Sequence, residues 1–142
     1  LRPVFDVASK MNRGVIILVY MSHKGAAEGY GQTVQNPATK QLIPQYRVFA
    51  EKALKWKADG AVVGATYPDR IREVSAILKK TVPIYSPGVG PQGGDVTAAV
   101  KAGASYLIVG RAIVEAGEPA ETAERIKETA WQSLVHRRQK SK

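Results

Sequence analysis

The clearest chemistry in this sequence lies in a glycine-rich segment that runs Tyr85-Ser86-Pro87-Gly88-Val89-Gly90-Pro91-Gln92-Gly93-Gly94-Asp95. It follows a short apolar run, Val82–Tyr85, and the next apolar run ends at Val109-Gly110-Arg111. Glycines let backbone N–H groups approach an anion closely, and an arginine guanidinium can bond two oxygens of the same anion. The combination predicts a site for a phosphorylated small molecule.

The residues within the loop Ser86–Asp95 support this interpretation. Gln92 offers an amide that can bond a phosphate oxygen without adding charge, and Asp95 is placed to cap the helix that follows. No Gly-Lys-Ser/Thr follows the glycines, so the segment is not a Walker loop. The alternatives are a flexible surface loop and, for Arg111, a surface ion pair with Glu115.

A second candidate is Met21-Ser22-His23-Lys24-Gly25-Ala26, which follows another apolar run. Ser22 could offer its hydroxyl and backbone groups to the edge of a heterocycle, although the motif alone favours a strand-end turn with a serine helix cap. We interpret His23 as structural or exposed, because no neighbouring carboxylate orients it. Thr66 or Tyr67, before Pro68, is typical of a helix cap.

The elements that position these residues alternate along the chain. Apolar runs of strand length lack polar alternation, which is typical of parallel strands buried on both faces; they are Val15–Tyr20, Gly60–Ala65, Val82–Tyr85 and Tyr106–Val109. Helical periodicity predicts helices over Ile43–Ala58, Pro68–Lys80, Val96–Ala102 and Pro119–Arg137, and Leu1–Met11 resembles the end of another helix. Ala26–Gln41 has no apolar periodicity and is predicted to be a long loop.

This alternation predicts an α/β fold with a parallel sheet in a single domain, residues 1–142. Four strands with their helices make about half of an eight-stranded barrel, which needs about 250 residues. A four-stranded doubly wound sheet is the structural alternative, and the pattern does not choose between them.

Composition narrows the function classes. The 142 residues include no cysteine, which excludes disulfides, thiol catalysis and cysteine-ligated metal. No apolar run is long enough to span a bilayer and no secretory signal is evident, so we expect a cytoplasmic protein. The net charge of +9 is spread along the chain, apart from the terminal run His136–Lys142, and no nucleic-acid-binding signature accompanies it. Nucleic acid is therefore not an expected partner.

Four motifs taken together resemble the archaeal form of the orotidine 5′-phosphate decarboxylase family. They are Met-Ser-His-x-Gly-Ala from Met21, Val-Gly-Ala-Thr from Val63, Ser-Pro-Gly-Val-Gly-x-Gln-Gly-Gly-Asp from Ser86 and Ile-Val-Gly-Arg-x-Ile from Ile108. The resemblance extends over nearly the whole chain. It implies a (β/α)8 TIM barrel of which these strands are the fifth to the eighth, and conversion of orotidine monophosphate to uridine monophosphate and carbon dioxide without cofactor or metal.

The resemblance also assigns substrate-binding roles. Ser22 would contact the pyrimidine edge, Gln92 would bridge to the phosphate, and Gly110 and Arg111 would complete the phosphate grip. The closing loop over the phosphate would comprise Pro87, Gly88, Val89, Gly90, Pro91, Gln92, Gly93, Gly94, Asp95, Val96 and Thr97.

The chain departs from the family at the catalytic residues. In the family a lysine is held between aspartates of an Asp-x-Lys-x-x-Asp motif on the third strand. This charged group disfavours the substrate carboxylate, and the lysine then protonates the carbanion that remains. This chain contains no such motif, so we expect no catalytic residue in it, an inactive isolated chain, and a requirement for the N-terminal half of the barrel.

The family's site also takes one aspartate from a second subunit, which implies a homodimer. Two rival functions remain. One is a sugar-phosphate decarboxylase or aldolase of the same barrel suprafamily, and the other is a non-catalytic phosphate-binding module.

Overall fold

The strands and helices follow the hydrophobic pattern of the chain. The computed structural model describes residues 2–139, with side chains up to His136. Its elements in chain order are α1 (Arg2–Lys10), β1 (Ile16–Tyr20), α2 (Ala26–Tyr30), β2 (Thr33–Gln35), β3 (Leu42–Pro44), α3 (Gln45–Lys55), β4 (Gly60–Val63), α4 (Pro68–Leu78), β5 (Ile84–Pro87), α5 (Val96–Ala102), β6 (Tyr106–Ile108), α6 (Arg111–Val114) and α7 (Pro119–Gln139).

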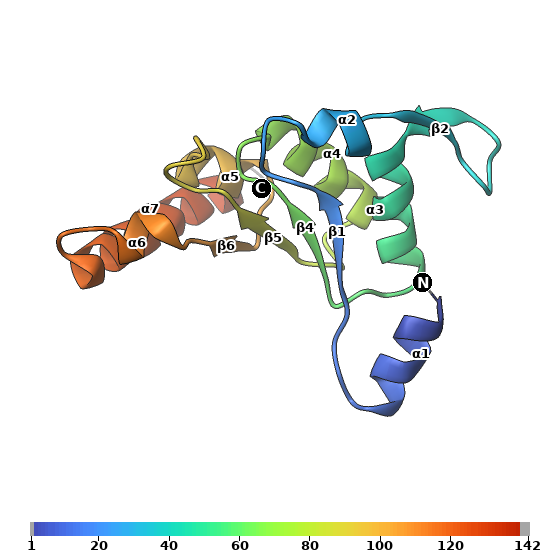
Figure 1. Ribbon diagram of the computed structural model, residues 1–142. Helices are drawn as coiled ribbons and strands as arrows, with labels where there is room; N and C mark the ends of the chain where they lie inside the picture. Colours follow the sequence, from blue (N-terminus) through green and yellow to red (C-terminus); the bar gives the residue numbers. More distant parts are fainter. Residues whose placement is uncertain (1, 140–142) are drawn as a thin grey trace.

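Four of the strands form one parallel sheet in the order β1-β4-β5-β6 (Figure 1). These are the four predicted strands, and the α/β fold with a parallel sheet is confirmed. The helices α3, α4 and α5 lie along one face of this sheet (Figure 1). The side chains that point to this face are buried; they include Val19, Ala61, Val63 and Ile84.

The opposite face of the sheet carries exposed apolar side chains. Ile16 and Leu18 of β1 and Tyr106 and Ile108 of β6 are 39–55% exposed. Tyr85 stacks on Tyr106 across this face, with ring centroids 4.8 Å apart. A doubly wound sheet has helices on both faces, which residues 2–139 do not provide, and this arrangement agrees with the open wall of a barrel.

The structure corrects the prediction for the segment after β1. Ala26–Gln41 is not a long loop: it contains the short helix α2 and the strand β2, which pairs antiparallel with β3. Consequently Ile43 and Pro44 belong to β3, and the helix predicted to begin at Ile43 begins at Gln45. Asn36 closes the hairpin, because its Oδ1 accepts from the amides of Ala38 and Thr39.

The other predicted helices and strands are present, with boundaries that agree with the sequence pattern to within a few residues. Residues 96–102 form α5 as predicted, with the Asp95 carboxylate accepting from the amide of Ala98 at 2.7 Å and Gly103 at the C-terminal cap. The strand predicted at Val82–Tyr85 instead covers Ile84–Pro87.

Of the basic terminal run, the side chains beyond His136 lie outside the described residues. No helix within residues 2–139 is long and apolar enough to cross a membrane.

A buried aromatic cluster joins β1 to α3 and α4. Tyr20, 3% exposed, makes edge contacts with Tyr46 and Tyr67, at 5.5 and 5.0 Å between ring centroids. The Tyr46 hydroxyl bonds Glu73 and accepts from Arg70 at 3.2 Å. Burial, together with the bond to Glu73, raises the pKa of Tyr46 from 10.0 to about 12.

This shift predicts a loss of stability in alkali. The neutral phenol is the protonated form, so its contribution is fully present below pH 10 and is lost as the pH rises toward 12. The free energy of unfolding should therefore fall by about 2 kcal/mol more between pH 10 and 12 in the unaltered chain than in Tyr46→Phe. Urea denaturation across this pH range measures the difference. Tyr106→Phe, which changes an exposed tyrosine, is the control and should behave like the unaltered chain.

Candidate functional site

The predicted site residues meet at the carboxyl ends of the strands. Ser22 follows β1, Pro87 ends β5 and leads into the glycine loop, and Gly110 and Arg111 follow β6. Together they line a cleft of about 260 Å³. Its lining residues are Ser22, Pro87, Gly88, Val89, Pro91, Gln92, Ile108, Gly110 and Arg111.

The glycine loop is closed on itself by backbone hydrogen bonds. Gly94 donates to the carbonyl of Gly88 at 3.0 Å, and Gly90 donates to the carbonyl of Gly94 at 3.1 Å. Val89 is 8% exposed and packs into the core, while Gln92 is exposed at the rim. The loop is therefore anchored at its base and carries its polar side chain toward the cleft, so a flexible surface loop does not describe it.

Not all predicted residues reach the cleft. Gly90, Gly93, Gly94, Asp95, Val96 and Thr97 are absent from its lining. The carboxylate of Asp95 caps α5, Val96 packs against the core, and Thr97 accepts from the hydroxyl of Ser133 on α7 at 3.2 Å. Ser86, counted in the loop, is buried in β5 and points toward the helices. Asp95, Val96 and Thr97 thus contact α5, the core and α7, and not the cleft.

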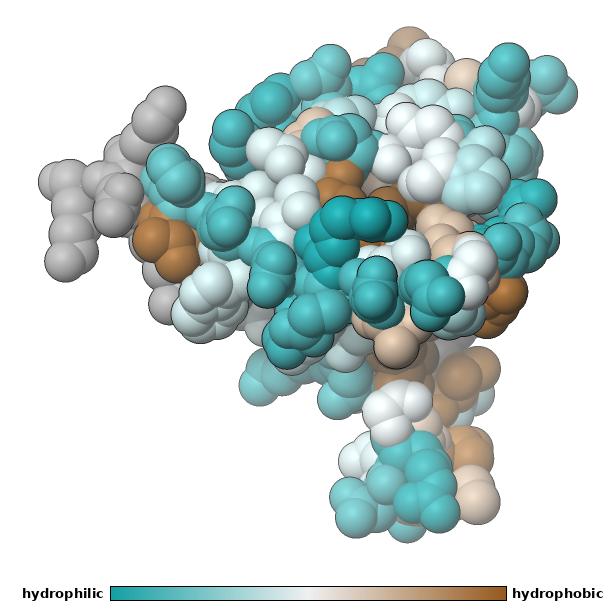
Figure 2. All heavy atoms as spheres, turned by 90° about the vertical axis from the view of Figure 1, so that its left-hand side faces the viewer, coloured by the Kyte–Doolittle hydropathy of each residue, from teal (hydrophilic) through white to brown (hydrophobic). Residues whose placement is uncertain are grey.

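Arg111 is the one ionisable side chain in the cleft lining. It is exposed and makes no ion pair with Glu115, although both residues lie within the described part of the chain. Ile108 is a lining residue that sequence reasoning missed. The period of two along β6 could have found it, because it lies on the same face as Tyr106. Figure 2 views the molecule from the side on which α6 and α7 lie, where hydrophobic residues appear among hydrophilic ones.

Thr66 and Tyr67 do not cap α4 with their side chains. Tyr67 occupies the N-cap position but makes no side-chain capping bond. Instead the Thr66 hydroxyl donates to the carbonyl of Ser22 at 2.8 Å, and the Tyr67 hydroxyl donates to the carbonyl of His23 at 2.9 Å. The predicted cap position, with Pro68 in the first turn of α4, is confirmed for Tyr67, but the two side chains bond a segment 44 residues away in sequence and not the helix amides.

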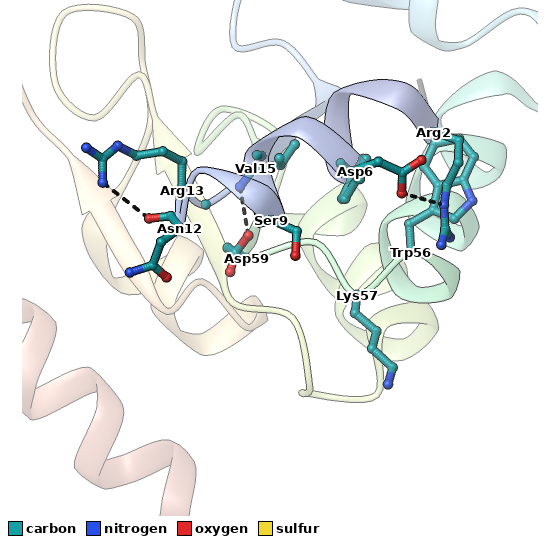
Figure 3. Close-up of a pocket in the computed structure, with 12 residues that line it drawn as sticks. Arg2, Asp6, Ser9, Asn12, Arg13, Val15, Trp56, Lys57 and Asp59 are labelled. Carbon is teal, nitrogen blue, oxygen red and sulfur yellow. Dashed lines mark hydrogen bonds and ion pairs between the residues drawn. The ribbon is translucent and has the colours of Figure 1, made fainter.

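A larger pocket of about 470 Å³ lies at the amino end of β1 (Figure 3). Three of its charged groups bond neighbours, Arg2 with Asp6 at 3.2 Å and Asp59 with the amide of Val15 at 2.7 Å, while Arg13 and Lys57 make no ion pair among the described residues. In parallel α/β folds ligands bind at the carboxyl ends of the strands, and the amino ends serve stability. The cleft at the glycine loop is therefore the candidate site.

The cleft can hold an anion and offer polar contacts, but its lining provides no acid or base for proton transfer. Backbone amides, the Gln92 amide and the Arg111 guanidinium suit a phosphate, and Ser22 suits a polar ring edge. Within residues 2–139 there is also no group of three or more histidine, aspartate or glutamate side chains that could hold a metal ion.

The sequence is similar to that of a known family over most of its length. Residues 1–126 match the family model described as "Orotidine 5'-phosphate decarboxylase / HUMPS family". Orotidine 5′-phosphate decarboxylase of Pyrococcus furiosus is 39% identical over 121 residues, which are 84% of this chain and 52% of that protein. The enzyme of Methanosarcina mazei is 38% identical over 118 residues, 83% of this chain and 48% of that protein.

Solved structures give the same result. The decarboxylase of Methanocaldococcus jannaschii, complexed with the inhibitor BMP, superposes with a TM-score of 0.76 and 34% identity over 91% of this chain and 55% of that one. That of Sulfolobus solfataricus gives 0.73 and 26% over 92% and 54%. The chain thus spans about half the length of the relatives it matches, and its fold is that of about half of their barrel, as the sequence predicted.

The close packing of the glycine loop on Ser22 gives a prediction for two glycines. Gly88 and Gly93 both have φ near +90°, but a Cβ at Gly88 would lie 2.7 Å from Ser22 Cβ and 2.7 Å from Gln92 Oε1, whereas none of the surrounding atoms lies within 4 Å at Gly93. Gly93→Ala should lower the free energy of unfolding by about 1 kcal/mol through backbone strain alone. Gly88→Ala should lower it by at least about 1 kcal/mol more, because it also displaces Ser22.

Urea denaturation of the two variants compares these losses, and Gly93→Ala serves as the matched control for positive φ. Equal losses would contradict the close contact between the loop and Ser22.

Proposed function

Because the chain belongs to the orotidine 5′-phosphate decarboxylase / HUMPS family, we propose that it is the substrate-binding half of an orotidine 5′-phosphate decarboxylase. The complete protein would be a carbon–carbon lyase of the cytoplasm that makes uridine monophosphate in pyrimidine biosynthesis. The observation that carries this proposal is the cleft in which Ser22, Gln92 and Arg111 converge on the glycine loop.

The phosphate would bind between the glycine loop and Arg111. Backbone amides and the Gln92 amide donate to its oxygens, and the guanidinium adds charge-assisted bonds from the opposite wall. Arg111 has no ion-pair partner among the described residues, so its charge is available to a ligand. Gly110, which follows β6, also lines the cleft beside Arg111 and would place its backbone near the phosphate.

The pyrimidine would lie beside Ser22. Because Gly88 has no side chain, the Ser22 side chain and the Gln92 amide oxygen both approach the space that its Cβ would fill. One ligand that extends from a phosphate to a ring could therefore contact both residues. This arrangement favours a nucleotide over a short sugar phosphate.

The chemical step needs groups that this chain does not bring to the cleft. Loss of carbon dioxide leaves an electron pair on the ring carbon, which must be stabilised and then protonated. The cleft lining holds one arginine and no carboxylate or lysine, so it offers no group that would transfer a proton at neutral pH. We therefore propose that the catalytic lysine and aspartates come from the other half of the barrel.

The open sheet face would receive that other half. Ile16, Leu18, Tyr106 and Ile108 expose apolar surface there, and β1 and β6 are the two edges of the sheet. Exposed strand edges and apolar surface favour association with further strands. We propose that the N-terminal half closes the barrel on this face and that the complete protein is a homodimer.

The direct test is decarboxylation of orotidine monophosphate by this chain alone and by this chain mixed with the N-terminal half of the barrel. We expect no turnover by the chain alone and turnover by the mixture, measured as release of labelled carbon dioxide. Turnover by the isolated chain would contradict the assignment of all proton transfer to the missing half.

Phosphate recognition gives a second test on the isolated chain. Arg111→Ala should weaken uridine monophosphate binding by at least about tenfold, because a charge-assisted hydrogen bond contributes about 1.5–3 kcal/mol. Arg125→Ala is the matched control, since Arg125 is an exposed arginine of α7 that bonds only its neighbour Thr122 among the contacts described. Isothermal titration measures both affinities.

The same titrations separate the rival functions. Preference for ribulose 5-phosphate over uridine monophosphate would favour a sugar-phosphate enzyme of the family. Affinity that falls steeply with salt and ignores the base would favour a phosphate-binding module without catalysis.

A further inference from the structure

Two side chains of one neighbouring loop hold the turn that carries Ser22. Thr66 Oγ1 donates to the Ser22 carbonyl at 2.8 Å, and the Tyr67 hydroxyl donates to the His23 carbonyl at 2.9 Å. The donors are consecutive residues, and so are the acceptors. Two adjacent side chains of the segment after β4 thus bond two adjacent carbonyls of the segment after β1, beyond the end of the sheet.

The backbone of β4 reinforces this connection. The amide of Gly64 donates to the carbonyl of Tyr20 at 2.9 Å, and a Cβ at Gly64 would lie 2.5 Å from Ser22 Cα. The turn therefore rests directly on the Gly64 backbone, with no room for a side chain between them. Ser22 cannot move toward β4.

On its other side Ser22 contacts the glycine loop. A Cβ at Gly88 would lie 2.7 Å from Ser22 Cβ and 3.3 Å from Ser22 Oγ. The distance between Ser22 and the loop thus depends on where the turn is held. Releasing the turn would change the spacing between the ring-binding and phosphate-binding parts of the cleft.

The Tyr67 hydroxyl is itself held in place. Its ring packs edge-on against Tyr20 at 5.0 Å, and Tyr20 packs against Tyr46 and Tyr30 in the buried aromatic cluster. A tyrosine fixed in this way provides a rigid donor. Neither Thr66 nor Tyr67 lines the cleft, so neither contacts a ligand there.

We propose that Thr66 and Tyr67 are positioning residues that fix Ser22 for recognition of the pyrimidine and leave phosphate binding to the glycine loop and Arg111. This inference rests on the proposed function. It assigns base discrimination to two hydroxyls that lie outside the cleft.

The test uses Thr66→Val and Tyr67→Phe, each of which removes one hydroxyl and keeps the shape of the side chain. Tyr30→Phe is the matched control. It removes a hydroxyl from a tyrosine that packs against Tyr20, as Tyr67 does, but the bonds described to the turn come from Thr66 and Tyr67 and not from Tyr30. Three quantities are measured on the chain: hydrogen exchange of the backbone amides over residues 21–28, the urea midpoint, and affinities for uridine monophosphate and for ribose 5-phosphate, which has the phosphate but no base.

We expect exchange at Ala26 to accelerate in Thr66→Val and Tyr67→Phe, since its amide donates to the carbonyl that Tyr67 holds, at 3.1 Å. Affinity for uridine monophosphate should fall about three- to tenfold, the size of one net hydrogen bond, while affinity for ribose 5-phosphate stays within about twofold. Tyr30→Phe should change neither exchange at the turn nor the ratio of the two affinities.

Unchanged exchange in both variants would overturn the inference, and so would an equal loss of affinity for the two ligands, because a general loss of structure affects both. If the unaltered chain does not prefer uridine monophosphate to ribose 5-phosphate, the proposed function fails and the assignment of base discrimination fails with it. Amide exchange then still shows whether the two hydroxyls hold the turn, so the two failures are distinguishable.

Discussion

The absence of side chains at Gly64 and Gly88 lets three segments of backbone meet at Ser22. A Cβ at either glycine would lie within 2.7 Å of an atom of Ser22, so the turn after β1 is enclosed between the ends of β4 and β5. Parallel pairing brings the three strand ends to the same edge of the sheet, and the glycines turn this proximity into contact. The cleft exists because of this contact, since its walls are the turn, the glycine loop and the residues after β6.

The two faces of the sheet differ in burial, and this difference gives them different roles. One face packs against helices around buried residues such as Val63 and Ile84, and this core holds the strand ends in register. The other face exposes Tyr106 and Ile108 and would be the wall of a barrel interior. The residues of the cleft are therefore carried by a layer that packs within this chain, and in the proposed function the other half of the barrel would supply the groups beside them.

The regular α/β part of this fold was predictable from sequence because its signals are local. Buried parallel strands are continuous apolar runs, and the cap at Asp95 depends on residues within one turn of helix. The hairpin β2–β3 was missed because its strands have three residues each, too few to show alternation. The dipeptide Asn36-Pro37, which lies between the two strands, is a sequence feature that could have indicated the turn. Roles of Thr66 and Tyr67 were not predictable, since their bonds join segments 44 residues apart and a local cap explained the same residues.

The close contact of Ser22 with Gly64 and Gly88 has a chemical consequence. Binding energy from a phosphate accelerates a reaction at a distant ring only if the two ends of the ligand are held at a fixed distance from each other and from the reacting groups. In the proposed function the phosphate would bind at the glycine loop with Arg111, and the ring would lie at Ser22. A loosely connected turn would let the ring shift while the phosphate stayed bound, and that energy would no longer reach the ring. The hydrogen bonds from Thr66 and Tyr67 and the close contacts at Gly64 and Gly88 restrict this movement of the turn. In the proposed function they would let the binding energy of the phosphate act on the pyrimidine, although the lining of the cleft contains no catalytic group.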